Sequence, residues 1–101
     1  MSPLIEQHRE ELAELCRRYH VKRLELFGSA ARGELRPESD LDFLVEFGEV
    51  PGERYFHAYF AFKESLEKLF ARQVDLVEEG AIKNPYFLAG LNENRLVVYA
   101  G

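Results

Sequence analysis

Alternating apolar and polar residues predict two strands in the first half of the chain, over residues 22–28 and 41–47. Successive side chains of a strand point to opposite faces, so every second residue shares a face. In the first stretch Leu24 and Leu26 oppose a mixed face of Arg23, Glu25 and Phe27. In the second stretch the apolar face opposes a face with Asp40, Asp42, Leu44 and Glu46. Both aspartates therefore lie on one side of the second strand.

Apolar residues three and four positions apart predict two long helices. The first begins at Ser2-Pro3, a helix-start signal, and runs to Tyr19 as one amphipathic helix of about four to five turns. The second covers about eighteen residues after the Gly/Pro-marked loop 48–52. Its aromatic face is interpreted as core. Alternatively, part of this face extends a partner-binding surface, formed by Tyr55, Phe56, His57 and Tyr59.

The remaining elements are shorter. Residues 73–78 predict a third strand, 30–33 a turn of helix, 85–92 a two-turn helix after Asn84-Pro85, and 95–99 a terminal strand. This order predicts an α/β (α+β) domain with a mixed sheet and helices packed on one face. A short connection makes the first two strands antiparallel, and a long helix makes the second and third parallel. Gly28-Ser29, Asp40, Asp42 and Asp75 would then meet at one edge.

Composition narrows the classes of function. The chain has 101 residues and is interpreted as one domain, 1–101. Its net charge of −5 argues against a protein that binds a long nucleic acid through many phosphates. It has neither a secretory signal nor an apolar run long enough to cross a membrane, so we expect a cytoplasmic protein. The lone Cys16 is interpreted as a small buried apolar group, and His8 as a packed, hydrogen-bonded histidine rather than a metal ligand.

The aspartates indicate a metal site. Closely packed carboxylates repel one another unless a cation lies between them, and Mg²⁺ or Mn²⁺ prefers oxygen ligands. An Asp-x-Asp pair, Asp40 and Asp42, can bridge two ions about 3.5–4 Å apart, and Asp75 can complete one site. The candidate catalytic and metal-binding residues are therefore Asp40, Asp42 and Asp75.

The Gly28-Ser29 turn suits a phosphate. Glycine lets the backbone approach closely, and the serine hydroxyl with the following N–H groups can hold phosphate oxygens. The candidate nucleotide-binding residues are Gly28, Ser29, Arg32 and Ser39. Arg32 has an equal alternative, an ion pair with Glu34 or Glu38, and Arg36 is solvated by default. A nucleoside triphosphate carried with its metal ions fits this arrangement.

Gly28-Ser29, ten residues, then Asp40-Leu41-Asp42 between hydrophobic strands resembles the signature of the DNA polymerase β-type nucleotidyltransferase superfamily. The short chain, the run from Gly28 to Asp42 and the Asn84-Pro85-Tyr86-Phe87 segment resemble its minimal nucleotidyltransferases (MNT), encoded beside HEPN-domain proteins. The resemblance implies that Asp40, Asp42 and Asp75 bind Mg²⁺ and that Ser29 contacts nucleotide phosphates.

The resemblance to the minimal nucleotidyltransferases further implies that the chain is an antitoxin. Such an antitoxin transfers AMP from ATP to a tyrosine hydroxyl of a HEPN toxin, which is an RNase. The chain lacks the Arg-x4-6-His pattern of that RNase, so the toxin would be a separate chain. We expect this chain to form either a homo-oligomer or a hetero-oligomer. Two alternatives stay open. One is a catalytically weak antitoxin that neutralises its toxin by binding alone. Nucleotide transfer to a small molecule is disfavoured, because no second domain holds such an acceptor.

Overall fold

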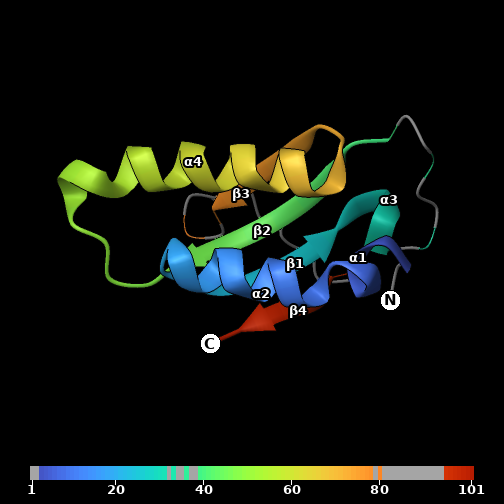
Figure 1. Ribbon diagram of the computed structural model, residues 1–101, viewed down its shortest axis with the longest axis horizontal. Helices are drawn as coiled ribbons and strands as arrows, with labels where there is room; N and C mark the ends of the chain where they lie inside the picture. Colours follow the sequence, from blue (N-terminus) through green and yellow to red (C-terminus); the bar gives the residue numbers. More distant parts are fainter. Residues whose placement is uncertain (1–2, 32, 34–35, 37–38, 79, 81–94) are drawn as a thin grey trace.

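A mixed four-stranded sheet forms the centre of the fold (Figure 1). The computed structural model describes residues 3–31, 33, 36, 39–78, 80 and 95–101, apart from the side chains of Ser29 and Ala30. The strands are β1 (Val21–Phe27), β2 (Leu41–Phe47), β3 (Val74–Glu78) and β4 (Leu96–Ala100), in the order β3-β2-β1-β4. β1 is antiparallel to β2 and β4, whereas β2 is parallel to β3, which confirms the predicted directions of the first three strands. The helix predicted over 85–92 lies outside the described residues.

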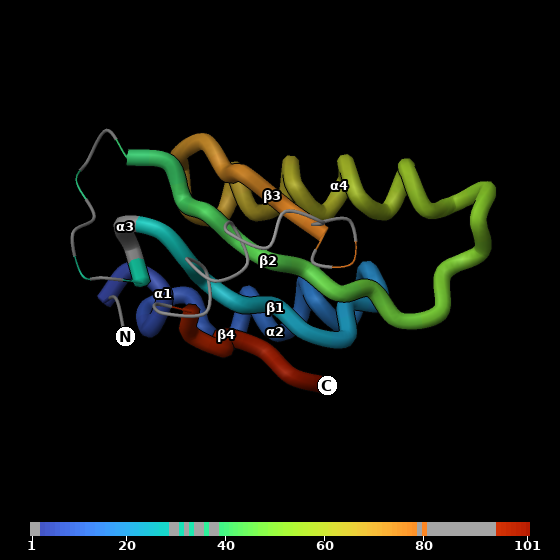
Figure 2. Tube along the Cα trace, turned by 180° about the vertical axis from the view of Figure 1, so that it is seen from behind, coloured from blue at the N-terminus to red at the C-terminus, as the bar shows by residue number. Residues whose placement is uncertain are grey.

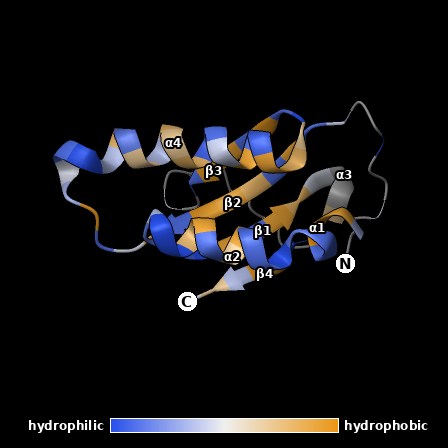
Figure 3. Cartoon of the chain, viewed as in Figure 1, coloured by the Kyte–Doolittle hydropathy of each residue, from blue (hydrophilic) through white to orange (hydrophobic). Residues whose placement is uncertain are grey.

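Two helices, α2 (Arg9–Arg18) and α4 (Gly52–Phe70), cover one face of this sheet. They lie in front of the strands in Figure 1 and behind them in Figure 2, where the molecule is seen from the other side. Apolar residues colour much of β1 and β2 in Figure 3, next to this helical layer. The buried core joins both layers and includes Leu12, Cys16, Leu24, Leu26, Phe43, Val45, Phe62, Leu66 and Leu76.

The prediction of one continuous N-terminal helix is wrong. α1 (Pro3–Gln7) ends one residue before His8, and α2 begins one residue after it, because His8 leaves the helical region with φ −114° and ψ 18°. The His8 ring packs edge-on against Phe70, with 5.5 Å between ring centroids. Its Nδ1 lies 3.7 Å from Glu11 Oε1, beyond hydrogen-bond distance, and has no hydrogen-bond partner among the described residues. The predicted packing is therefore confirmed and the predicted hydrogen bond at this nitrogen is not.

Helix α4 divides its aromatic residues between core and surface. Phe62, Leu66 and Phe70 follow one another at four-residue spacing and are buried. In contrast, Phe56 is 71% exposed and Phe60 61% exposed. The helix ends where Ala71 takes the left-handed conformation, φ 53°. The core interpretation holds for the second half of the helix, and two phenylalanines of the first half remain on the surface.

The turn after β1 is a single helical turn, α3 (Gly28–Ala31), two residues earlier than predicted. Cys16 is buried as predicted, and its burial raises the pKa of the thiol to about 12. No helix among the described residues is long and apolar enough to span a membrane.

Candidate active site at the carboxylate end of the sheet

Strand pairing brings Asp42 and Asp75 together. They are direct partners in the parallel β2–β3 register, so both side chains lie on the same face of neighbouring strands about 4.8 Å apart. This face is opposite α2 and α4, because Leu41, Phe43, Val74 and Leu76 on the alternate positions belong to the helix-facing core. Asp42 is half-buried and Asp75 is exposed. The two carboxylates predicted from separate strands therefore form one pair.

At Gly28 the backbone of the chain passes close to the Asp42 carboxylate. Phe27, the last residue of β1, pairs with Asp42, and the chain then turns at Gly28 with φ +74°. A Cβ added at Gly28 would overlap Asp42 Oδ2 and lie 3.3 Å from Asp42 Cγ. Both the positive φ and this close approach require glycine. The helical turn α3 starts here, so its first N–H groups lie beside the carboxylate pair.

Asp40 and Ser39 belong to the segment that enters β2. Asp40 is exposed and precedes Leu41, whose N–H donates to the Gln73 carbonyl over 3.0 Å. The Ser39 hydroxyl accepts the Arg36 N–H at 3.2 Å, and the Ser39 N–H donates to the Arg36 carbonyl at 3.0 Å. Ser39 therefore closes a turn before the Asp-x-Asp pair. In this structure its hydroxyl bonds to the Arg36 backbone, whereas the sequence predicts a contact of Ser39 with a nucleotide; the two contacts are compatible.

Arg72 is a residue of this site that the sequence pattern did not indicate. Its Nη1 donates to the carbonyls of Arg36 and Ser39, each over 3.1 Å. A guanidinium with several donors can join two carbonyls in this way. Arg72 thus ties the turn before β2 to the residues before β3 and positions Asp40 relative to Asp75. An isolated arginine before a strand gives no periodic signal, so only the fold reveals this role.

Two tyrosines of α4 fasten the edge strand that carries Asp75. The Tyr59 hydroxyl donates to the Leu76 carbonyl, and the Tyr55 hydroxyl donates to Glu78. Burial raises the pKa of Tyr59, and the negative charges of Asp75 and Glu78 raise it further. Both phenols therefore stay protonated donors at neutral pH, and this part of the aromatic face holds β3 in place.

A buried carboxylate, Glu25, lies two residues before Phe27 on the same sheet face and is 3% exposed. Arg23 Nη2 lies 2.9 Å from its Oε1, and Arg95 Nε donates to its Oε2 at 2.6 Å. These arginines compensate the buried charge. The cluster links β1 to the residue before β4, and the sequence pattern indicates no functional role for any of its three members.

Two carboxylates suit a cation that also binds a substrate. Among the described residues no group of three His, Cys, Asp or Glu side chains is arranged to hold a metal ion, so the three aspartates do not form a closed cage. Mg²⁺, however, commonly binds one or two carboxylates and completes its octahedron with water and substrate phosphates. The oxygen donors of Asp42 and Asp75 fit that mode, and Asp40 lies two residues before Asp42 in the chain. The predicted side-chain contacts of Ser29 and Arg32 lie outside the described side chains.

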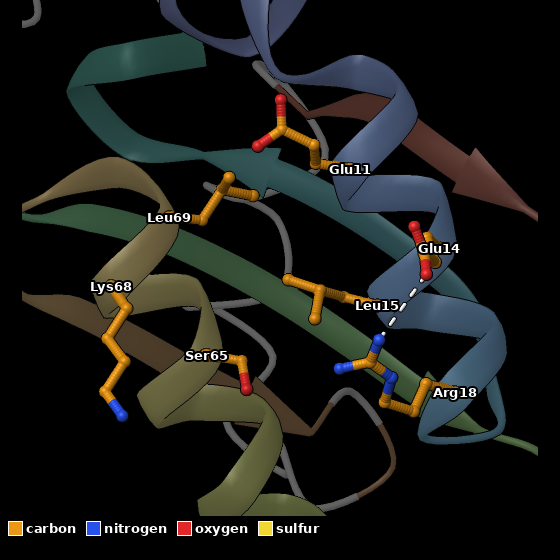
Figure 4. A pocket seen from close by; sticks show the side chains of 7 residues that line it. All are labelled: Glu11, Glu14, Leu15, Arg18, Ser65, Lys68 and Leu69. Carbon is orange, nitrogen blue, oxygen red and sulfur yellow. Dashed lines mark hydrogen bonds and ion pairs between the residues drawn. The ribbon is translucent and has the colours of Figure 1, made fainter.

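A cleft of about 440 Å³ lies between α2 and α4 on the helical side of the sheet (Figure 4). Leu15 and Leu69 line it between side chains of both charges, including Glu14, which pairs with Arg18 at 3.4 Å. Its lining includes two acids, Glu11 and Glu14, and two bases, Arg18 and Lys68. This cleft lies on the opposite face from the aspartates and contributes nothing to their site.

The fold and the paired aspartates beside a glycine turn define a nucleotidyltransferase. Residues 5–98 match the family described as "Nucleotidyltransferase domain", and the chain belongs to this family. It is 39% identical over 95 residues to the Methanocaldococcus jannaschii protein named "Putative protein adenylyltransferase MJ0128", covering 94% of this chain and 91% of the relative. It is also 37% identical over 81 residues to "Protein adenylyltransferase MntA" of Thermococcus cleftensis, covering 80% of this chain and 76% of that protein.

Solved structures give the same class. One described as "Structure of putative minimal nucleotidyltransferase" superposes with a TM-score of 0.76 at 33% identity and covers 95% of both chains. The fold is also that of a chain in a complex of "tri-AMPylated Shewanella oneidensis HEPN toxin" with MNT antitoxin, with a TM-score of 0.65 at 15% identity over 96% of this chain and 73% of that chain. The resemblance to the minimal nucleotidyltransferases is confirmed.

Proposed function

We propose that this chain transfers AMP from ATP to a tyrosine hydroxyl of a separate HEPN-domain toxin and thereby acts as its antitoxin in the cytoplasm. The observation that carries the proposal is the in-register pair of Asp42 and Asp75 beside Gly28. Relatives named as protein adenylyltransferases support AMP as the transferred group. The similar fold of an MNT antitoxin, whose HEPN partner is AMPylated, supports the choice of acceptor.

In this proposal the acceptor oxygen attacks the α-phosphorus of ATP. The bond from that phosphorus to the bridging oxygen breaks, and pyrophosphate leaves. The exposed Asp75 takes the proton of the hydroxyl. Gly28 keeps the backbone close enough for the first N–H groups of α3 to face phosphate oxygens. Mg²⁺ ions held by Asp40, Asp42 and Asp75 would neutralise charge that develops on the phosphate chain. Ser29, Arg32 and Ser39 remain predicted nucleotide contacts.

A second candidate function is neutralisation of the toxin by binding alone. The exposed Phe56 and Phe60 favour it, since they lie four residues apart on one side of α4 and form an apolar surface suited to a protein partner. The two candidates are compatible in one molecule, because these phenylalanines are on the helical layer and the aspartates are on the opposite sheet face.

The test is a transfer assay with radiolabelled ATP, Mg²⁺ and the HEPN protein encoded beside this chain. We expect label on the toxin with the wild type and none with the Asp40→Ala/Asp42→Ala variant, which also fails to neutralise. The Glu10→Gln variant, a charge change on an exposed site of α2, serves as the matched control and retains labelling. Neutralisation by the double variant with no label from the wild type would replace the enzymatic proposal by binding alone.

A further inference from the structure

A second pocket, of about 240 Å³, is lined by residues around the end of α2 and the start of α4. It is formed where the chain leaves α2 and where the loop after β2 enters α4. Two arginines, Arg18 and Arg54, and two histidines, His20 and His57, line it. Among the described residues that line it there is no carboxylate, although the chain carries a net charge of −5. A cavity that gathers two arginines and two histidines in an acidic protein is suited to an anion.

The backbone holds this pocket in shape. His20 adopts φ 60°, a conformation that non-glycine residues seldom take, and its carbonyl accepts the Gly48 N–H at 2.8 Å. This bond joins the turn after α2 to the loop that leads into α4. The segments that lead to the two walls of the pocket are therefore joined by a backbone hydrogen bond.

The start of α4 adds a second favourable feature. Pro51 is the N-cap of this 19-residue helix and supplies no side-chain hydrogen bond to the first turn. The first N–H groups of a helix bear partial positive charge and favour an anion. Arg54 and His57 project from the first two turns of the same helix into the pocket lining. Glu49 and Glu53 are exposed nearby but do not line the pocket, and Glu14 pairs with Arg18.

We propose that this basic pocket binds a phosphate group, either of free pyrophosphate or of a nucleotide, without a metal ion. Guanidinium groups donate charge-assisted, bidentate hydrogen bonds to phosphate oxygens, and the ring N–H of a histidine donates to them as well. The site is separate from the aspartates, since β1 begins near the pocket and pairs with Asp42 at its other end, and seven residues of strand span roughly 20 Å. The proposal therefore does not depend on the proposed reaction.

The test is a titration of the ¹⁵N-labelled chain with sodium pyrophosphate and with AMP, followed by amide chemical shifts at constant ionic strength. EDTA keeps metal ions away from the aspartates. We expect saturable shifts at Val50, Arg54 and His57, and none at Gly28 or Asp42. Tighter binding of pyrophosphate assigns the site to the free anion, and tighter binding of AMP assigns it to a nucleotide phosphate. Shifts that rise linearly without saturation, or that occur only beside the aspartates, overturn the proposal.

Matched variants separate a specific site from general attraction. The Arg54→Gln/His57→Gln variant replaces the Arg54 guanidinium and the His57 ring, both at exposed positions, with shorter neutral amides and should weaken binding by about tenfold or more. Arg17→Gln removes the same charge as one of these changes from a neighbouring exposed position of α2 that does not line the pocket. It should weaken binding by less than about twofold. An equal loss in both variants would show a nonspecific charge effect and overturn the proposal.

Discussion

The two ends of the central sheet carry opposite charges, although one strand, β1, reaches both. At its C-terminal end the carboxylates of Asp42 and Asp75 lie in register beside the Gly28 backbone. At its N-terminal end a pocket is lined by Arg18, His20, Arg54 and His57. The carboxylates of the acidic end repel a phosphate unless cations lie between them, whereas a basic site attracts a phosphate without a metal ion. Dependence on metal is therefore the property that distinguishes the two ends.

Asp42→Asn should have the largest effect. It removes one of the two paired carboxylates with little change in shape, and we expect AMP transfer to fall by about 100- to 1000-fold, the usual loss when an electrostatic group of an active site is removed. Added Mn²⁺ should restore little activity. The measurement is the initial rate of labelling of the HEPN protein, with circular dichroism to check the fold.

Glu49→Gln provides the matched control for this prediction, because Glu49 is exposed at the opposite end of the sheet. It should leave transfer within about twofold of the wild type. Asp42→Asn should also leave metal-free pyrophosphate binding at the basic pocket unchanged. A loss of that binding in Asp42→Asn would show that the two ends are one site.

Gly28→Ala should have the next largest effect. The new Cβ meets Asp42 Oδ2, and φ at this position is +74°. Because the carboxylate must move, we expect transfer to fall by about 10- to 100-fold and the free energy of unfolding to fall by about 1–3 kcal/mol. Transfer assays and urea denaturation measure the two losses.

Gly33→Ala separates the two causes. Gly33 has a nearly identical φ of +76°, but no atom of the described residues beyond its chain neighbours lies within 4 Å of an added Cβ. This variant should lose about 1 kcal/mol of stability from backbone strain and keep its transfer rate. Equal transfer rates in Gly28→Ala and Gly33→Ala would mean that contact with Asp42 is irrelevant to the reaction.

Glu25→Gln tests the buried charge cluster on β1, the strand that runs from the basic pocket to the aspartates. The Glu25 carboxylate is buried between Arg23 and Arg95, so neutralising it leaves two guanidinium groups with less compensation. We expect the free energy of unfolding to fall by about 2 kcal/mol, measured by urea denaturation. Glu46→Gln is the control, because Glu46 faces Lys22 at 3.7 Å on the exposed surface, and it should cost less than about 0.5 kcal/mol. Equal losses would show that burial of the Glu25 pair has no special role.

The acidic end was predictable from the sequence, and the basic end was not. Period-two alternation placed Asp40 and Asp42 on one face, and the length of the connection after β2 made β3 parallel, so Asp75 fell in register with Asp42. Both arguments depend only on residues within one strand or on the length of the connection that follows it. The basic pocket draws its charges from α2, a turn and α4, and no local pattern relates such distant positions.

The other features that the sequence pattern does not predict also depend on residues far apart in the chain or on tertiary packing. Arg95 pairs with Glu25 across 70 positions, and Arg72 bonds to carbonyls of a turn more than thirty positions earlier. The break at His8 was missed because the apolar spacing continues through it, whereas the backbone changes direction there to bring Ile5 and Leu12 into the same core. Side-chain to backbone bonds and helix breaks of this kind depend on tertiary packing, which outweighs local propensity.

Cys16→Ala should have the smallest effect. It concerns the buried core between the helices and the sheet, and the effect is on how the free energy of unfolding depends on pH. Burial raises the pKa of the Cys16 thiol from its ordinary value near 9.0 to about 12, so the folded chain holds this proton where the unfolded chain releases it. Stability from this group is complete below about pH 9 and is lost as pH rises through 9 toward 12, with a slope of about 1.4 kcal/mol per pH unit. The Tyr59 pKa is also raised, so it adds to the loss above about pH 10. Urea denaturation at pH 8, 9 and 10 should give a shallower slope for Cys16→Ala than for the wild type. Identical slopes would mean that the thiol titrates in the folded chain and that the core under the sheet admits water.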